Sequence, residues 1–128
     1  MPQRRILLVD DEPYVTSVVS TKLRKLGDEI WVASDGRQAL DLATTHRPQL
    51  VVSDYQMPVM DGFALAVALK ADARTSQVPV VLLTARGHLL SPSQLAQTNV
   101  RQILAKPFST RELLGVIDEL FIALPEAA

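Results

Sequence analysis

The sequence contains no cysteine, which excludes a disulfide framework and thiolate chemistry. It has no apolar run long enough to cross a bilayer, and its first residues, MPQRR, lack the apolar core of a signal peptide. The five glycines are scattered and form neither a G-x-G-x-x-G pattern nor a P-loop. No basic excess is present either, because 13 Lys and Arg residues face 14 Asp and Glu residues. We therefore expect a soluble cytoplasmic domain that binds neither nucleic acid nor membrane.

The composition is that of an ordinary globular domain, with 48% hydrophobic and 21% charged residues. A chain of 128 residues can form one hydrophobic core without disulfides or a structural metal. No linker or low-complexity segment interrupts it. We predict a single domain across residues 1–128, with a core over about 4–124 and no effector domain after the last helix.

Five short apolar runs, rich in β-branched residues, are spaced along the chain. They occupy residues 6–9, 30–33, 50–53, 78–84 and 102–105. Most of them are continuously apolar rather than alternating, which is typical of strands that are covered on both faces. The pattern favours a parallel sheet enclosed between helices.

Helical patterns follow each of these runs. They cover residues 13–27, 35–47, 62–73, 91–99 and 109–124. Pro13 suits a first helical turn, Ser91 and Pro92 suit an N-cap and the position after it, and Ser109 and Glu112 have the spacing of a capping box. The chain is therefore predicted to repeat a βα unit five times. We expect an α/β fold with a doubly wound open parallel sheet, helices on both faces and right-handed crossovers.

Charged and polar residues stand at the ends of four predicted strands. Asp10 and Asp11 follow the first strand, Asp54 follows the third, Thr84 ends the fourth and Lys106 follows the fifth. In open α/β sheets, ligands bind at the carboxyl ends of the strands. Three carboxylates, a hydroxyl and an ammonium group are thus expected to converge on one edge of the sheet.

Three carboxylates in one place are unfavourable unless a cation balances them, because like charges raise one another's pKa. Mg²⁺ is the expected ion, with Mn²⁺ able to replace it. Since Mg²⁺ usually combines carboxylates with waters and a phosphate, the site suits phosphoryl chemistry. Asp54 could act as a nucleophile toward phosphorus and form an acyl phosphate, while Lys106 and Thr84 would stabilise the phosphoryl oxygens.

Four stretches carry a resemblance to a known family: LLVDDE, VVSDYQMPVMDG, VVLLTA and AKPF. In this order and spacing they resemble the receiver domain of bacterial response regulators, which belong to two-component signalling systems and include chemotaxis regulators. The resemblance covers essentially the whole chain. It implies a flavodoxin-like, three-layer αβα fold with strand order 2-1-3-4-5, an order for which a chemotaxis receiver is an established example.

The resemblance also implies a phosphorylation site. Asp54 would be the phosphoacceptor and would attack a phosphohistidine on a sensor histidine kinase or a histidine phosphotransfer protein. Asp11 and Asp54 would bind Mg²⁺ together with the backbone carbonyl of Gln56. Asp10 would lie beside the ion, often acting through water.

Two further residues would complete this site and start a conformational switch. Lys106, in a cis peptide with Pro107, would pair with the phosphoryl group, and Thr84 would hydrogen-bond to it and move its loop. The chain would then be a two-state signalling phosphoacceptor and not a conventional enzyme, with only phosphotransfer and autodephosphorylation at its own site. The fourth helix, fifth strand and fifth helix would bind an unknown downstream protein, as a monomer or as a phosphorylation-dependent dimer.

Some positions depart from the usual receiver pattern. Ile103 stands where receivers commonly carry an aromatic residue that switches with Thr84, and Val100 and Arg101 replace a common Gly-Ala pair. The output face is therefore expected to be unusual. Gln56 and Arg86 occupy variable positions that should influence the lifetime of the phosphoryl group.

Other functions compete with this interpretation. An Asp-dependent phosphatase typically has a D-x-D motif after its first strand, whereas this chain has adjacent acids there and its candidate nucleophile follows the third strand. A pseudo-receiver that never accepts phosphate is the other alternative, and it rests on the departures at Ile103 and at Val100–Arg101. The sequence leaves open whether the chain is a stand-alone regulator or part of a longer protein.

Overall fold

The computed structural model describes residues 3–85 and 90–123 and contains the five predicted βα units. The strands are β1 (Arg5–Val9), β2 (Glu29–Ala33), β3 (Leu50–Asp54), β4 (Val80–Thr84) and β5 (Val100–Ala105). The helices are α1 (Pro13–Lys25), α2 (Gly36–His46), α3 (Gly62–Ala71), α4 (Pro92–Ala96) and α5 (Thr110–Ala123). All neighbouring strands are parallel and their order is β2-β1-β3-β4-β5. The predicted doubly wound α/β fold is confirmed.

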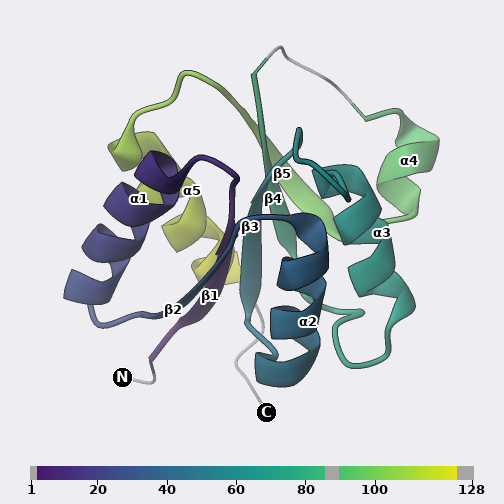
Figure 1. Ribbon diagram of the computed structural model, residues 1–128, viewed down its shortest axis with the longest axis horizontal. Coiled ribbons are helices and arrows are strands. Elements are labelled where there is room, and N and C mark those ends of the chain that lie inside the picture. The colour runs from purple at the N-terminus through teal and green to yellow at the C-terminus, as the bar shows by residue number, and fades with distance from the viewer. Residues whose placement is uncertain (1–2, 86–89, 124–128) are drawn as a thin grey trace.

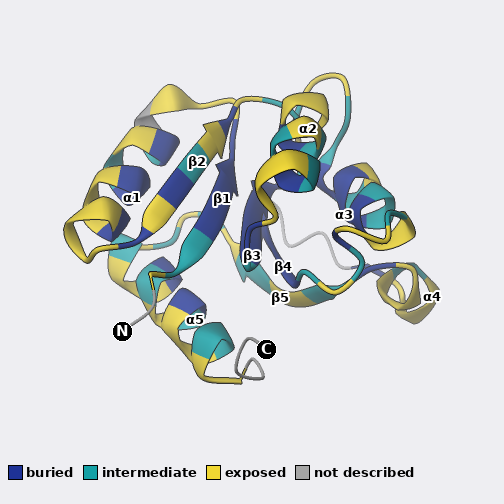
Figure 2. Ribbon diagram, turned by 90° about the horizontal axis from the view of Figure 1, so that it is seen from below, coloured by how far each residue is buried: buried dark blue, intermediate teal, exposed yellow. Residues whose placement is uncertain are grey.

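The sheet lies between two layers of helices. Helices α1 and α5 cover one face, and α2, α3 and α4 lie on the other side (Figure 1). Successive residues of a strand point to opposite faces, so Leu7 and Val9 pack in the core on the α2 and α3 side, while Ile6 and Leu8 pack on the α1 and α5 side. Figure 2 shows β3 and β4 buried along their length and exposed residues in the edge strands β2 and β5. Burial on both faces explains the continuously apolar runs.

Strand β5 begins two residues earlier than predicted and contains an irregularity. Val80 pairs with Val100, but Val81 pairs with Gln102, so Arg101 is an extra residue in the edge strand. Arg101 and Gln102 are both exposed, although consecutive residues of a regular strand would face opposite sides. The unusual Val100–Arg101 pair therefore coincides with a bulge on this edge.

Helix α4 is shorter than the predicted 91–99 helix. It keeps the predicted N-terminus, where Ser91 and Gln94 form a capping box, but it ends at Ala96. None of its residues is buried. Without an apolar stripe against the core, little packing energy is available to extend it.

Candidate functional site

The carboxyl ends of β1 and β3 bring three acids together. Asp10 and Asp11 follow β1, Asp54 ends β3, and their carboxylate oxygens include a set within 4.8 Å of one another. Asp10 and Asp54 are 3% and 6% exposed, whereas Asp11 is exposed to solvent. The predicted convergence of these three side chains is therefore present in the structure.

Lys106 reaches this cluster from the loop after β5. Its Nζ lies 3.3 Å from Oδ1 of Asp54 and 3.5 Å from Oδ2 of Asp10. Its backbone N–H donates to the carbonyl of Thr84 at 2.7 Å, and the Lys106–Pro107 peptide is cis. One ammonium group thus contacts two of the three carboxylates.

The environment disfavours the charged forms of the two buried acids. Burial raises the pKa of Asp54; the nearby charge of Asp11 acts in the same direction, while Lys106 and a backbone hydrogen bond from Gln56 oppose it. Burial also raises the pKa of Asp10, although the N–H of Glu12 donates to its Oδ1 at 2.9 Å and stabilises the charge. Burial alone would lower the pKa of Lys106, but the charges of Asp10 and Asp54 outweigh it and leave that pKa raised. Burial is thus the largest cause of the raised pKa of each acid, and Lys106 offsets it only in part.

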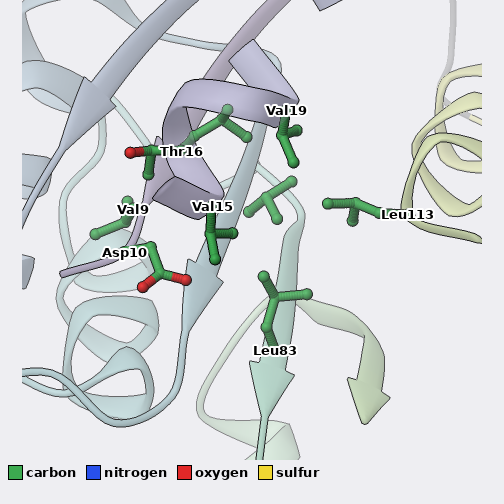
Figure 3. Close-up of a pocket in the computed structure, with 9 residues that line it drawn as sticks. Val9, Asp10, Val15, Thr16, Val19, Leu83 and Leu113 are labelled. Atoms are coloured by element: carbon green, nitrogen blue, oxygen red, sulfur yellow. The ribbon is translucent and has the colours of Figure 1, made fainter. Parts of the chain in front are cut away.

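A small, partly open void helps to explain the burial of Asp10. The void has a volume of about 10 Å³ and lies between β1, β3, β4, α1 and α5. Figure 3 shows Val15, Val19, Leu83 and Leu113 pointing into this space, with Asp10 at its rim. Its walls are mostly apolar, so one side of Asp10 is shielded from water.

Thr84 presents a hydroxyl group without a partner. Its side chain is 1% exposed, and Oγ1 makes no hydrogen bond to the part of the chain that the structure describes. Buried hydroxyl groups are normally hydrogen-bonded, so an orphaned one at a strand end indicates a site for a ligand oxygen.

The loop after Asp54 packs tightly against its strand. Gly62 donates its N–H to the carbonyl of Tyr55 at 2.8 Å, and a Cβ at Gly62 would lie 2.5 Å from the carbonyl oxygen of Asp54. Asp61 accepts a hydrogen bond from the N–H of Ala64 at 2.7 Å and is thus the N-cap of α3. An open groove of about 460 Å³ lies beside this loop; its walls are formed by Asp11, Tyr55, Gln56, Met57, Pro58 and Asp61.

The residues at this edge fit a hard divalent cation. The acid cluster offers carboxylate oxygens, which Mg²⁺ and Mn²⁺ prefer over nitrogen and sulfur ligands. Burial, the largest cause, raises the pKa of both Asp10 and Asp54, and the neighbouring acid acts in the same direction, so a cation bound between them would favour their charged forms. A carbonyl from Gln56 would come from the loop that borders the same groove as Asp11.

The other sequence predictions have different outcomes. Ile103 is partly buried and packs against the core on the α2 and α3 side. Arg86 lies outside the described residues. The sequence did not indicate that the rings of Trp31 and His46 stack, with centroids 4.8 Å apart. It also did not indicate that Gly36 permits close contact with Met60, whose carbonyl oxygen would lie 2.6 Å from a Cβ at Gly36.

Among the described residues, no helix combines the length and apolarity that a membrane span requires.

Comparisons with known proteins agree with this geometry. The family model of the response regulator receiver domain matches residues 6–118. The chain is 33% identical to a probable chemotaxis protein CheY of Rhizobium etli, over 94% of both chains. It is 34% identical to the DNA-binding dual master transcriptional regulator RpaA of Synechocystis, over 97% of this chain but 53% of that protein. The chain thus spans about half the length of some curated relatives, such as RpaA and the response regulator Rre1 of Synechocystis.

Solved structures give the same result. The chemotaxis response regulator CheY4 of Vibrio cholerae matches with a TM-score of 0.84 and 29% identity, over 93% of this chain and 99% of that one. The receiver domain of a Pseudomonas aeruginosa sensor histidine kinase, with a magnesium ion coordinated in its active site cleft, matches with a TM-score of 0.79 and 30% identity, over 92% and 97% of the two chains. The chain therefore belongs to the receiver domain family of two-component response regulators.

Proposed function

We propose that Asp54 accepts a phosphoryl group from a phosphohistidine on a sensor histidine kinase or a histidine phosphotransfer protein, in a reaction that requires Mg²⁺. The observation that supports this best is the convergence of Asp54 with two other carboxylates and with Lys106, whose Nζ lies 3.3 Å from its Oδ1. The solved relative from Pseudomonas aeruginosa, which holds magnesium in its cleft, adds support for the metal requirement.

The residues of the site would divide the chemistry between them. A carboxylate oxygen of Asp54 forms a bond to phosphorus while the phosphorus–nitrogen bond breaks and the imidazole of the donor keeps the electron pair. Asp11, Asp54 and the Gln56 carbonyl would hold Mg²⁺, with Asp10 beside it, and the ion would neutralise charge on the phosphoryl oxygens. Lys106 would move part of its interaction from Asp54 to a phosphoryl oxygen.

Thr84 would connect phosphorylation to the rest of the molecule. Its buried hydroxyl makes no hydrogen bond to residues 3–85 or 90–123, so a phosphoryl oxygen within reach would give it a partner and shift the equilibrium between two conformations of the β4 end. The output is the face of α4, β5 and α5, where Ile103 supplies aliphatic packing in place of an aromatic switch. That face would bind a downstream protein, and this domain itself would not contact nucleic acid.

The test is the intact mass of the protein after incubation with acetyl phosphate and Mg²⁺. We expect one added phosphate on the wild type and none on Asp54→Asn or in the presence of a chelator. Circular dichroism of the variant should show an unchanged fold. A wild type that gains no phosphate under fast quenching, or a variant that is labelled normally, would contradict the proposal and favour the pseudo-receiver alternative.

A further inference from the structure

The loop between β3 and α3 contains a strained turn at Val59. The N–H of Met60 donates to the carbonyl of Pro58 at 2.8 Å, which closes a three-residue γ-turn with Val59 at its centre. The φ angle of Val59 is 72°, in the left-handed region. A γ-turn with a positive central φ is the rarer and more strained form, and a β-branched residue is disfavoured there.

Contacts on both sides of the turn keep this conformation in place. Met60 packs so closely on Gly36 that a Cβ there would meet both its carbonyl oxygen and its side chain. Just after the turn, Asp61 caps α3 and the N–H of Gly62 donates to the carbonyl of Tyr55. The turn therefore follows from its neighbours, and Val59 occupies it although glycine or asparagine would fit with less strain.

The side chain of Val59 makes little contact within its own chain. It is 80% exposed and is not among the residues that line the groove beside the loop after Asp54. The structure describes four other exposed large hydrophobic residues, Leu26, Val32, Leu95 and Ile122. Those four lie in a helix, in a strand or at the end of α1. Within the described ranges, Val59 alone is a large, exposed apolar residue in a loop at the carboxyl edge of the sheet.

We propose that Val59 is a contact and specificity residue for the protein that delivers the phosphoryl group. This inference rests on the proposed function. Asp54 is only 6% exposed, so a phosphohistidine that reaches it must bring the surface of its carrier protein over the rim of the site. Val59 is exposed in the loop whose residues Pro58 and Asp61 line a groove together with Asp11, so an apolar side chain of the carrier protein beside the phosphohistidine could cover Val59 on docking. A small donor such as acetyl phosphate would not need this contact.

The experiment compares protein donors with a small donor. The protein donors are encoded in the genome that carries this chain: histidine kinases, which phosphorylate themselves with radiolabelled ATP, and phosphotransfer domains, which are labelled by way of such a kinase. The acceptors are wild type, Val59→Asn, which tolerates the left-handed turn but removes the apolar surface, and Val59→Ile, which retains it. Ile122→Ala, at a residue that is 84% exposed near the end of α5, is the matched control.

We expect Val59→Asn to accept phosphate about five- to tenfold more slowly than wild type, at subsaturating concentration, from the protein donor that labels the wild type fastest. Labelling by acetyl phosphate should be unchanged, and Val59→Ile and Ile122→Ala should behave as wild type with both donors. Equal transfer to Val59→Asn and wild type would overturn the inference, as would an equal loss with acetyl phosphate, which would place Val59 in the acceptor site itself. If acetyl phosphate labels the wild type but no protein donor does, the proposed phosphohistidine donor is wrong.

Discussion

Gly62 should contribute both to the stability of the fold and to the position of the phosphoacceptor. A Cβ at this first residue of α3 would lie 2.5 Å from the carbonyl oxygen of Asp54, 2.9 Å from Cδ2 of Leu82 and 3.0 Å from Cα of Tyr55. Two of these three atoms belong to backbone and cannot rotate away. Gly62→Ala therefore has to displace either α3 or the end of β3.

The size of the effect follows from two opposing contributions. Alanine in a helix is favoured over glycine by about 0.5–1 kcal/mol. Overpacking a filled site costs typically 1–3 kcal/mol and more where backbone must shift. We expect Gly62→Ala to lower the free energy of unfolding by about 2 kcal/mol, equivalent to roughly 5–10 °C in Tm.

Gly115→Ala is the matched control. Gly115 lies inside α5, is exposed, and has nothing within 4 Å of its added Cβ. This variant should gain about 0.5–1 kcal/mol, because only the helix propensity changes. Urea unfolding followed by circular dichroism measures both variants, and labelling by acetyl phosphate tests the site. If Gly62→Ala loses less than about 0.5 kcal/mol and is labelled at the wild-type rate, the close approach to Asp54 does not constrain this loop.

Three other predictions concern charge and packing. Because burial raises the pKa of Asp54 in the folded protein, its charge destabilises the native state at pH 7. In Mg²⁺-free buffer Asp54→Asn should therefore be more stable than wild type. Urea titrations should show this difference in stability shrinking as the pH falls toward 3.8, the ordinary pKa of an aspartate side chain. A difference that does not depend on pH would refute the reasoning. Leu113→Ala enlarges the void beneath Asp10 and should cost about 2–5 kcal/mol in urea unfolding, and a cost below about 1 kcal/mol would mean that α5 collapses into the space. Arg4→Met leaves Asp28, whose side chain is 5% exposed, without its cation and should lower the free energy of unfolding by about 2–3 kcal/mol. Arg74→Met removes the exposed Arg74–Asp72 pair and should cost only about 0–1 kcal/mol. Equal losses in the two variants would show that burial of the pair does not matter here.

The fold was predictable because its signals are local and repeated. Continuously apolar runs identified strands with two covered faces, and caps such as Ser91 and Ser109 marked where helices begin. The strand ends then placed Asp10, Asp11 and Asp54 on one edge without any knowledge of side-chain geometry. These inferences depend on periodicity and on the common direction of parallel strands, and both can be read from one sequence.

The remaining features depend on how distant loops approach each other. The bulge at Arg101 arises from the register between β4 and β5, which apolar periodicity does not determine. The left-handed turn at Val59 is contrary to the preference of valine, and it exists because Met60 is packed on Gly36. A glycine followed by ordinary helix formers gives no sign of such a contact until the structure places α2 beside the loop.

The contacts around Asp54 also suggest which part of the molecule can respond to a change there. Gly36 of α2 and Gly62 of α3 both lie against backbone atoms of the loop after Asp54, so the loop is closely packed at these two points. On the β4 side, the buried hydroxyl of Thr84 has no hydrogen-bond partner within the described part of the chain, and the next helix, α4, has no buried residue. The C-terminal end of α4 is held by the ammonium group of Lys70, 3.4 Å from the Thr98 carbonyl and 3.5 Å from that of Ala96.

Motion requires either free space or weakly held elements, because well-packed interiors transmit strain without deforming continuously. We infer that a negative charge added at Asp54 changes the conformation of α4 and β5 rather than that of α2. Amide hydrogen exchange with and without acetyl phosphate tests this directly. Protection against exchange should change in α4 and β5 and stay constant in α2. A change confined to α2 would contradict the inference.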